Sequence, residues 1–228
     1  MTHPYLAQLT GVIGDYGVGG TARLVARELR YLTVSRLVRR SYSQSGEDRL
    51  AWDLLGRPPH GLFVDIGAND PVRLSNTYLL YRRGWRGLAV DASPVHRQRW
   101  ARLRPDDEFV VSGVGSRPSA AEPFHVHRAN ALSTFSRDRS DRAVADGHPR
   151  TAVVDVPVRT LADLLDQHVG ERAIDFMTVD VEGRDLDVLE SNDWDRYRPR
   201  LICTEVDRAD ADEIDAFLRA RGYRIAAA

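Results

Sequence analysis

The stretch GLFVDIGANDPVRLSNTY, residues 61–78, decides the fold. Its first part, 61–68, is an almost continuous apolar run, which is typical of a strand buried on both faces of a sheet. The turn after it carries the single glycine Gly67, whereas a dinucleotide site carries the three glycines of G-x-G-x-x-G. The stretch therefore predicts a buried strand followed by a ligand-binding turn of a different kind.

Strand and helix patterns alternate along the chain around this stretch. Pro157 places one strand at a sheet edge, because proline cannot donate a ladder hydrogen bond. The alternation predicts an α/β fold with a mainly parallel sheet and helices on both faces. Strands are expected at 61–68, 86–93, 108–116, 153–160, 173–183, 198–206 and from 223, and helices at 75–83, 94–104, 161–169, 185–192 and 209–222.

Two segments stand apart from this alternation. Residues 1–40 contain leucines and valines at near-helical spacing with arginines between them, which predicts an amphipathic helical extension. This extension could be a lid, a dimer contact or a helix packed on its own domain. Residues 41–228 form the main domain, with an irregular insert at about 117–150 that we expect to cover the substrate.

Composition excludes several classes of protein. The net charge is −1 and all 32 basic residues are arginine, so no basic field predicts a nucleic-acid partner. The single cysteine, Cys203, excludes an intrachain disulfide framework, and we expect an inert buried thiol in a central strand. No apolar run approaches roughly 18 residues and the N-terminus lacks a signal pattern, which predicts no stable membrane insertion and a cytoplasmic location.

Acidic residues at the expected strand ends indicate a nucleoside ligand. Asp91 ends the second strand, 24 residues after Gly67, where an acid commonly binds the hydroxyls of an adenosine ribose. The turn itself suits a diphosphate poorly, because Pro71 has no N–H and Asp70 repels phosphate. A nucleoside with a cationic or zwitterionic tail fits better, and S-adenosylmethionine combines adenosine, a sulfonium cation and an amino acid.

A second acidic group follows a later strand. Asp180 and Glu182 point the same way if the strand continues, and Glu205 ends the neighbouring strand. The three could bind a divalent cation such as Mg²⁺, or one could act as a general base. Alternatively, Glu182 caps the next helix and Asp180 binds the cofactor amine. His125 and His127 form a weak H-x-H metal signal, and we expect exposed, structural histidines.

The run SYSQSGED, residues 41–48, allows two interpretations. Ser43 or Ser45 caps a helix whose first turn carries Glu47 and Asp48. Alternatively, Gln44 or Glu47 folds over the methionine end of the cofactor.

Four blocks in order resemble the FkbM family of S-adenosylmethionine-dependent methyltransferases, and within it a subgroup with such motifs. This resemblance covers residues 41–225 and implies a Rossmann-like class I methyltransferase fold and O-methylation of a sugar or natural product. Related members carry histidines where Asn69 and Asp70 stand. The blocks are SYSQSGEDRL (41–50), FVDIGANDPVRLSNTYLLYRRGWRGLAVDASP (63–94), DFMTVDVEGRDLDVLESNDW (175–194) and RPRLICTEV (198–206).

The resemblance also implies roles for single residues. Asp91 holds the ribose, and Asp180 lies near the reactive methyl group. The methionine part lies against the first strand and its turn, at Asp65, Gly67, Ala68 and Asn69. The adenine lies against the next two strand ends, at Ala92, Ser93, Ser112 and Gly113.

Two other functions stay open at this point. The chain could be a catalytically inactive binding module, since it departs from the family pattern at residues 69 and 70. A nucleotide-dependent oxidoreductase is disfavoured by the missing glycines. The sequence ends at Ala228, within or just after a last strand, and an uncovered edge strand favours a homodimer.

Overall fold

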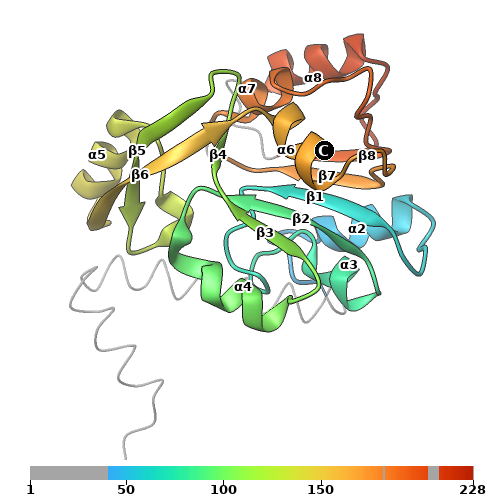
Figure 1. The fold of residues 1–228 in the computed structure, drawn as a ribbon, viewed down its shortest axis with the longest axis horizontal. Helices are drawn as coiled ribbons and strands as arrows, with labels where there is room; N and C mark the ends of the chain where they lie inside the picture. Colours follow the sequence, from blue (N-terminus) through green and yellow to red (C-terminus); the bar gives the residue numbers. More distant parts are fainter. Residues whose placement is uncertain (1–40, 182, 205–210, 228) are drawn as a thin grey trace, which may run out of the picture.

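The computed structural model describes residues 41–181, 183–204 and 211–227, so the extension expected at 1–40 lies outside the described residues (Figure 1). Its strands are β1 (Leu62–Ile66), β2 (Arg86–Asp91), β3 (Glu108–Val111), β4 (Gly113–Val114), β5 (Ser119–His127), β6 (Arg150–Arg159), β7 (Phe176–Val179) and β8 (Leu201–Thr204). Its helices are α2 (Glu47–Leu54), α3 (Tyr78–Arg82), η1 (Pro94–His96), α4 (Arg97–Leu103), η2 (Asn130–Leu132), α5 (Arg137–Ala145), α6 (Leu161–His168), α7 (Asp185–Glu190) and α8 (Ala211–Ala220). Within these residues, no helix has the length and apolar character needed to cross a bilayer.

The main sheet has five strands in the order β3-β2-β1-β7-β8, and every neighbouring pair is parallel. The α/β fold with a mainly parallel sheet is thereby confirmed. The chain builds outward from β1 to β3 and then returns to the other side of β1 with β7. Such a reversal leaves a crevice beyond the carboxyl ends of the two central strands.

Alternating side chains of β1 face two helical layers. Val64 and Ile66 belong to the core that includes α6, α7 and α8, whereas Phe63 packs with residues of α2 and α3. Figure 1 shows the two layers on opposite sides of the sheet. Because Asp65 follows Phe63 by two positions, its side chain shares the α2–α3 face.

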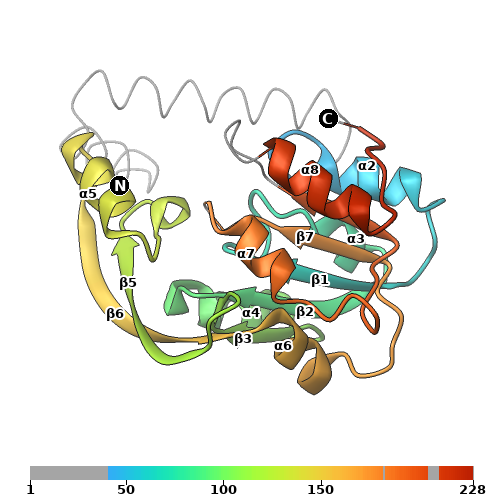
Figure 2. The same ribbon diagram turned by 90° about the horizontal axis from the view of Figure 1, so that it is seen from above.

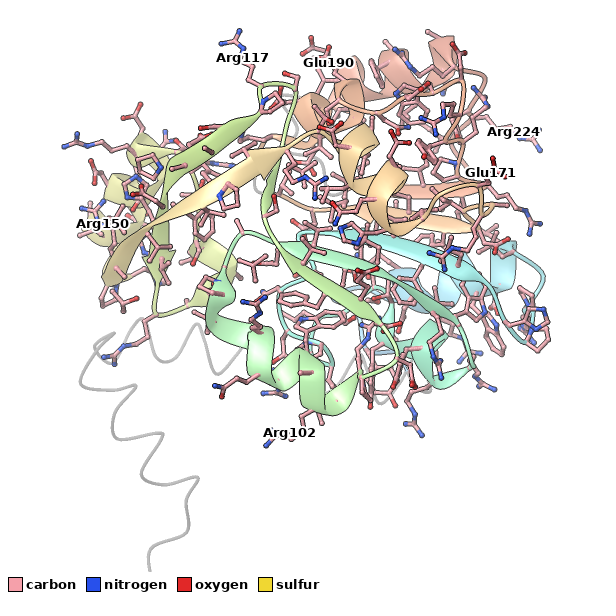
Figure 3. The ribbon with its side chains drawn as sticks, viewed as in Figure 1. Arg102, Arg117, Arg150, Glu171, Glu190 and Arg224 are labelled. Atoms are coloured by element: carbon pink, nitrogen blue, oxygen red, sulfur yellow. The ribbon has the colours of Figure 1, made fainter. Side chains whose placement is uncertain are left out.

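The insert forms a second, three-stranded sheet in the order β4-β6-β5. The antiparallel strands β5 and β6 run away from the main sheet and carry α5 at their far end (Figure 2). Arg150 lies at that outer end and pairs with Asp141 of α5 at 2.9 Å (Figure 3). The alternation at residues 124–127 predicted a short strand, which is present as part of β5, whereas the rest of the insert is more regular than expected. Buried Phe124, Val126 and Val156 form a small core of their own.

Two strand predictions are corrected by this second sheet. The strand expected at 108–116 breaks at Ser112, whose hydroxyl lies 2.8 Å from the Gly113 carbonyl and 3.1 Å from that of Pro157. The strand with Pro157 lies between two others instead of at an edge. Proline is tolerated there because the register shifts between Ser119 and Glu122, which leaves its position without a ladder partner.

Two element ends also differ from expectation. The helix expected from Ser75 begins at Tyr78, although the Ser75 hydroxyl does accept the Tyr78 N–H at 3.1 Å. Residues 223–227 form no strand. Instead the Tyr223 hydroxyl donates to the Pro199 carbonyl at 2.7 Å, and its ring packs on Trp194, which holds this segment beside α8.

A buried arginine ties the β1 turn to the layer beneath the sheet. Arg104 is 1% exposed, whereas Arg102 of α4 points into solvent (Figure 3). The Arg104 Nε donates to Asp107 at 2.6 Å, and its Nη1 donates to Thr77 Oγ1 at 3.0 Å. The guanidinium also lies 4.2 Å from the ring centroid of Trp100. Arg104 therefore fixes the loop that leads out of the β1 turn.

Replacing this arginine should destabilise the fold strongly. We expect Arg104→Met to lower the free energy of unfolding by about 3–5 kcal/mol, because Asp107, whose side chain is 0% exposed, loses its partner. Urea unfolding followed by circular dichroism measures the change. The control is Arg219→Met, which breaks an exposed pair with Asp215 and should cost less than about 1 kcal/mol. Equal losses in both variants would contradict this assignment.

Candidate functional site

A cavity of about 510 Å³ lies at the carboxyl ends of the main-sheet strands and is closed on one side by the insert. Its volume falls in the range of small-molecule sites. Most of the residues predicted from the sequence line it. These are Gln44, Glu47, Gly67, Asn69, Asp91, Ala92, Ser93, Ser112, Gly113 and Asp180.

The turn after β1 makes the closest backbone approach in the site. Gly67 has φ +85°, and a Cβ there would lie 1.7 Å from the Asp180 carbonyl oxygen. The Gly67 N–H donates to the Val90 carbonyl at 2.8 Å. Only glycine fits this position, because a side chain would collide with backbone and strain the left-handed conformation. The ends of β1, β2 and β7 are thus held together around one residue.

Asp91 organises the ligand loops with backbone hydrogen bonds. Its Oδ2 accepts from the Asn69 N–H at 2.8 Å, and its Oδ1 accepts from the Ser93 N–H at 2.7 Å. Each carboxylate oxygen keeps acceptor capacity for a ligand hydroxyl. Burial raises the pKa of Asp91 to about 6, although both backbone hydrogen bonds oppose this shift.

Several backbone donors of the loop after Gly67 are already hydrogen-bonded within the protein. The Asp70 Oδ1 accepts the N–H groups of Val72 and Arg73, both at 2.9 Å. Asn69 already donates to Asp91, and Pro71 has no N–H. Asp70 is further held by Arg99 at 3.2 Å. Asn69 and Asp70 therefore have local structural partners, and the turn disfavours a diphosphate.

Asp65 and Ala68 do not line the cavity, although the sequence placed them in the ligand site. Asp65 faces the helical layer below the sheet, is 5% exposed and accepts from Thr77 Oγ1 at 2.5 Å. Burial raises its pKa to about 6. Ala68 packs against Ala89 and Trp100. Both residues support the turn from behind and do not face the cavity.

Residues 41–48 lead into α2, whose N-cap is Gly46, and the contact of Gln44 or Glu47 with a cofactor stays a prediction. The Ser43 hydroxyl accepts the N–H groups of Gly46 and Asp48 at the start of α2, at 3.1 and 3.3 Å. Gln44 and Glu47 line the cavity. Asp48 lies in the first turn of α2, as the sequence predicted, but it is 0% exposed and accepts from Ser41 and Ser43 hydroxyls at 2.7 and 2.9 Å. This buried carboxylate holds the segment in place.

Of the three predicted metal ligands, Asp180 alone belongs to the part of the chain that the structure describes. Asp180 lines the cavity, whereas Glu182 and Glu205 lie outside the described residues. Among residues 41–181, 183–204 and 211–227, no three His, Cys, Asp or Glu side chains form a group suited to a metal. The Mg²⁺ site therefore stays an untested prediction.

Two predictions about single side chains are corrected. His125 and His127 are 8% and 2% exposed instead of solvent-facing, and the His127 ring lies 2.8 Å from the Ser140 hydroxyl. His127 thereby ties the insert sheet to α5, whereas the His125 ring lies 3.4 Å from the Arg150 guanidinium of β6. Cys203 lies on β8, the last strand of the described main sheet, and not on a central strand. It lines the cavity, and burial raises the pKa of its thiol to about 11, so the thiol stays neutral.

The insert supplies a cavity wall that sequence reasoning could not resolve into residues. Phe135 packs against Phe124 in a tilted arrangement, with ring centroids 4.8 Å apart and an interplanar angle of 59°. A Cβ on Gly113 would lie 2.5 Å from the Phe135 ring, so the absent side chain makes room for this aromatic. The wall contains Phe124, Asn130, Ala131, Leu132, Ser133, Thr134 and Phe135.

The charge of the lining favours a cationic ligand rich in hydroxyl groups. Among the described lining residues, Glu47, Asp91 and Asp180 are acidic. Arg184 is the basic residue there, and it pairs with Glu122 at 3.0 Å and with Asp187 at 3.5 Å. Its charge is thereby compensated within the protein, and a ligand anion gains little from it.

The chain is similar to known proteins in sequence and in structure. A family model described as "Methyltransferase FkbM domain" matches residues 65–225. No curated protein matches the chain. The chain is similar to the crystal structure of a methyltransferase FkbM from Methylobacillus flagellatus KT, at 15% identity and a TM-score of 0.35. The match covers 78% of this chain but only 46% of that protein, so the chain spans less than half its length.

The buried Asp65 gives a pH dependence of stability. The folded protein holds its proton up to a pH of about 6, whereas an unfolded aspartate releases it near 3.8. Stability should therefore fall as the pH rises through this window, by roughly 3 kcal/mol from this group. Asp65→Asn stays neutral, so its unfolding free energy should decline less between pH 4 and 7. If urea titrations give both proteins the same change in unfolding free energy between pH 4 and 7, Asp65 is not a buried carboxyl with a raised pKa.

Proposed function

Because the chain belongs to the FkbM methyltransferase family, whose model matches residues 65–225, we propose that it methylates a hydroxyl group of a small molecule. The methyl donor in this proposal is S-adenosylmethionine, and the acceptor is a sugar or natural product. The observation that carries the proposal is the cavity at the switch point of the sheet, with three carboxylates and a compensated arginine. The narrower resemblance to one subgroup of the family stays a prediction.

The residues present fit the adenosine half of this donor. Asp91 offers two carboxylate oxygens to the ribose hydroxyls, while its backbone bonds keep it fixed. Ala92 flanks the adenine, and the insert phenylalanines, Phe124 and Phe135, give it an apolar wall. Ser112 and Gly113 line the same end of the cavity.

The opposite half of the donor lies near Gly67 and Asp180 in this proposal. S-adenosylmethionine supplies an electrophilic methyl group on a positively charged sulfur. Gly67 lines the cavity without a side chain, and Asp180 and Glu47, which also line it, supply negative charge. A cationic donor is therefore attracted to the site, whereas the diphosphate of a dinucleotide meets carboxylates and occupied N–H groups.

Transfer to a hydroxyl requires a proton acceptor. The acceptor hydroxyl must lose its proton as the new carbon–oxygen bond forms. Among the described residues, Asp180 and Glu47 are the carboxylates that line this end of the cavity, and we assign the proton acceptor to Asp180. Holding the reacting atoms close and in line supplies most of the rate in such a site. Glu182 and Glu205 were also predicted here and remain candidates.

Two alternatives lead to different experimental outcomes. An oxidoreductase should bind NAD, which the occupied donors of the turn disfavour. An inactive binding module should bind a partner without binding the methyl donor.

Association of two copies through an uncovered edge strand also stays a prediction. A monomer mass at micromolar concentration would contradict it.

Calorimetric titration tests the proposal directly. We expect micromolar binding of S-adenosylmethionine and S-adenosylhomocysteine, no binding of NAD, and at least tenfold weaker binding by Asp91→Ala, which lacks the ribose acceptor. Addition of Mg²⁺ to the same titration tests the metal prediction. The control Arg219→Met lies on α8 and should bind as the unmodified protein does. Absence of binding to either adenosyl ligand would overturn the proposal.

The raised pKa of Asp91 predicts a pH-dependent affinity. With its pKa at about 6 in the free protein, the carboxyl is ionised above this pH and then accepts both ribose hydroxyls. Affinity for S-adenosylhomocysteine should therefore fall as the pH drops through 6, approaching tenfold per unit below it. Asp91→Asn should bind weakly with little change between pH 5 and 7.5. An unchanged slope in this variant would assign the titration to another group.

A further inference from the structure

Asn130 of η2 closes a ring of hydrogen bonds around the ribose site. Its Oδ1 accepts from the Ser93 hydroxyl at 2.7 Å, and its Nδ2 donates to Asn69 Oδ1 at 2.9 Å. The backbone N–H groups of the same two residues, Asn69 and Ser93, donate to Asp91. Four residues from three parts of the chain thus form one closed circuit, which we call the Asn130 ring.

The hydrogen bonds around the ring fix the orientation of the Asn130 amide. The Ser93 hydroxyl accepts the Val95 N–H at 3.4 Å, so its own proton is available for Asn130 Oδ1. Ser93 is 2% exposed, which keeps water from replacing this bond easily. Asn69 is held on a third side, because its carbonyl accepts the Trp100 indole N–H at 2.8 Å. The donor and acceptor of each bond to the Asn130 side chain are therefore fixed, and its partners Asn69 and Ser93 are themselves held in place.

The segment after Asn130 forms a wall of the cavity. Residues 131–135 all line it, and the Ser133 N–H donates to the Asn130 carbonyl at 2.9 Å. Thr134 then pairs with His125 of β5 through both backbone groups, at 2.9 and 3.1 Å. The position of Asn130 consequently sets the start of this wall, and β5 sets its end.

We propose that Asn130 is a positioning residue that couples occupancy of Asp91 to the placement of the wall formed by residues 131–135. Ribose hydroxyls on Asp91 immobilise its carboxylate, which holds Asn69 and Ser93, and these two hold Asn130. Donor binding thereby orders the wall before the acceptor enters. This inference rests on the proposed function, because it takes the occupant of Asp91 to be the donor ribose.

Hydrogen–deuterium exchange of a peptide spanning residues 129–135 tests the coupling, with and without S-adenosylhomocysteine. Two variants remove the Asn69–Asn130 bond from opposite ends. Asn130→Ala removes the bridging amide, and Asn69→Gly removes its partner at a position whose φ of +44° glycine accepts without strain. Ser136→Ala is the control, because it removes the α5 cap, which accepts the Arg139 N–H, and leaves the ring intact.

In the unmodified protein we expect the ligand to slow exchange in this peptide at least tenfold. Asn130→Ala and Asn69→Gly should still bind the ligand in calorimetry, about fivefold to twentyfold more weakly, without slowing exchange in the peptide. The double variant should lose no more than either single variant, whereas Ser136→Ala should respond fully. A purely structural asparagine would alter basal exchange without removing the response to ligand.

Two results overturn the coupling, and they are distinguishable. If the unmodified protein binds the ligand but its wall does not respond, or if Asn130→Ala responds fully, the coupling is wrong and the proposed function stands. If the unmodified protein does not bind the ligand at all, the proposed function and the coupling fall together.

Discussion

The contact between the β1 turn and the end of β7 is the constraint on which the site depends. Gly67 leaves no room for a side chain beside the Asp180 carbonyl, and its N–H is bonded to the end of β2. Three strand ends are thereby brought together where the order of the sheet reverses. The reversal of strand order creates the crevice. Because Gly67 has no side chain, backbone groups can pack together at the bottom of this crevice. Asp91 and Asp180 then lie on either side of this floor.

Burial and pairing of charge decide what the crevice can hold. The arginine in the lining is compensated by Glu122 and Asp187, and the acidic residues Asp91 and Asp180 line the same cavity. Beneath the sheet, Arg104 and Asp107 form a fully buried pair that supports the same loop from below. The buried pair of Arg104 and Asp107 thus has a structural role, whereas the carboxylates that line the cavity have the ligand-binding role in this account.

The sequence allowed prediction of the main sheet and of most of the cavity floor, because these depend on local apolar runs and on residues at strand ends. Asp65 was assigned to the ligand because its position at a strand end does not reveal which face of the sheet its side chain occupies. It lies two residues after Phe63 and therefore shares the face of Phe63. The edge strand at Pro157 and the unbroken strand through Ser112 were predicted from local sequence alone. The register shift beside Pro157 and the passage of the chain from one sheet to the other at Ser112 depend on partners distant in sequence. For Asn130 the sequence indicated only a place in the insert expected to cover the substrate, since its bonds join residues 37 and 61 positions away.

A crystal structure of the protein with S-adenosylhomocysteine tests the central claim most directly. The account predicts ligand density in the cavity, with both ribose hydroxyls on the Asp91 carboxylate, adenine beside Ala92, and the sulfur of the ligand on the side of the cavity that Asp180 lines. Ribose placed away from Asp91, or ligand bound outside this cavity, would contradict it.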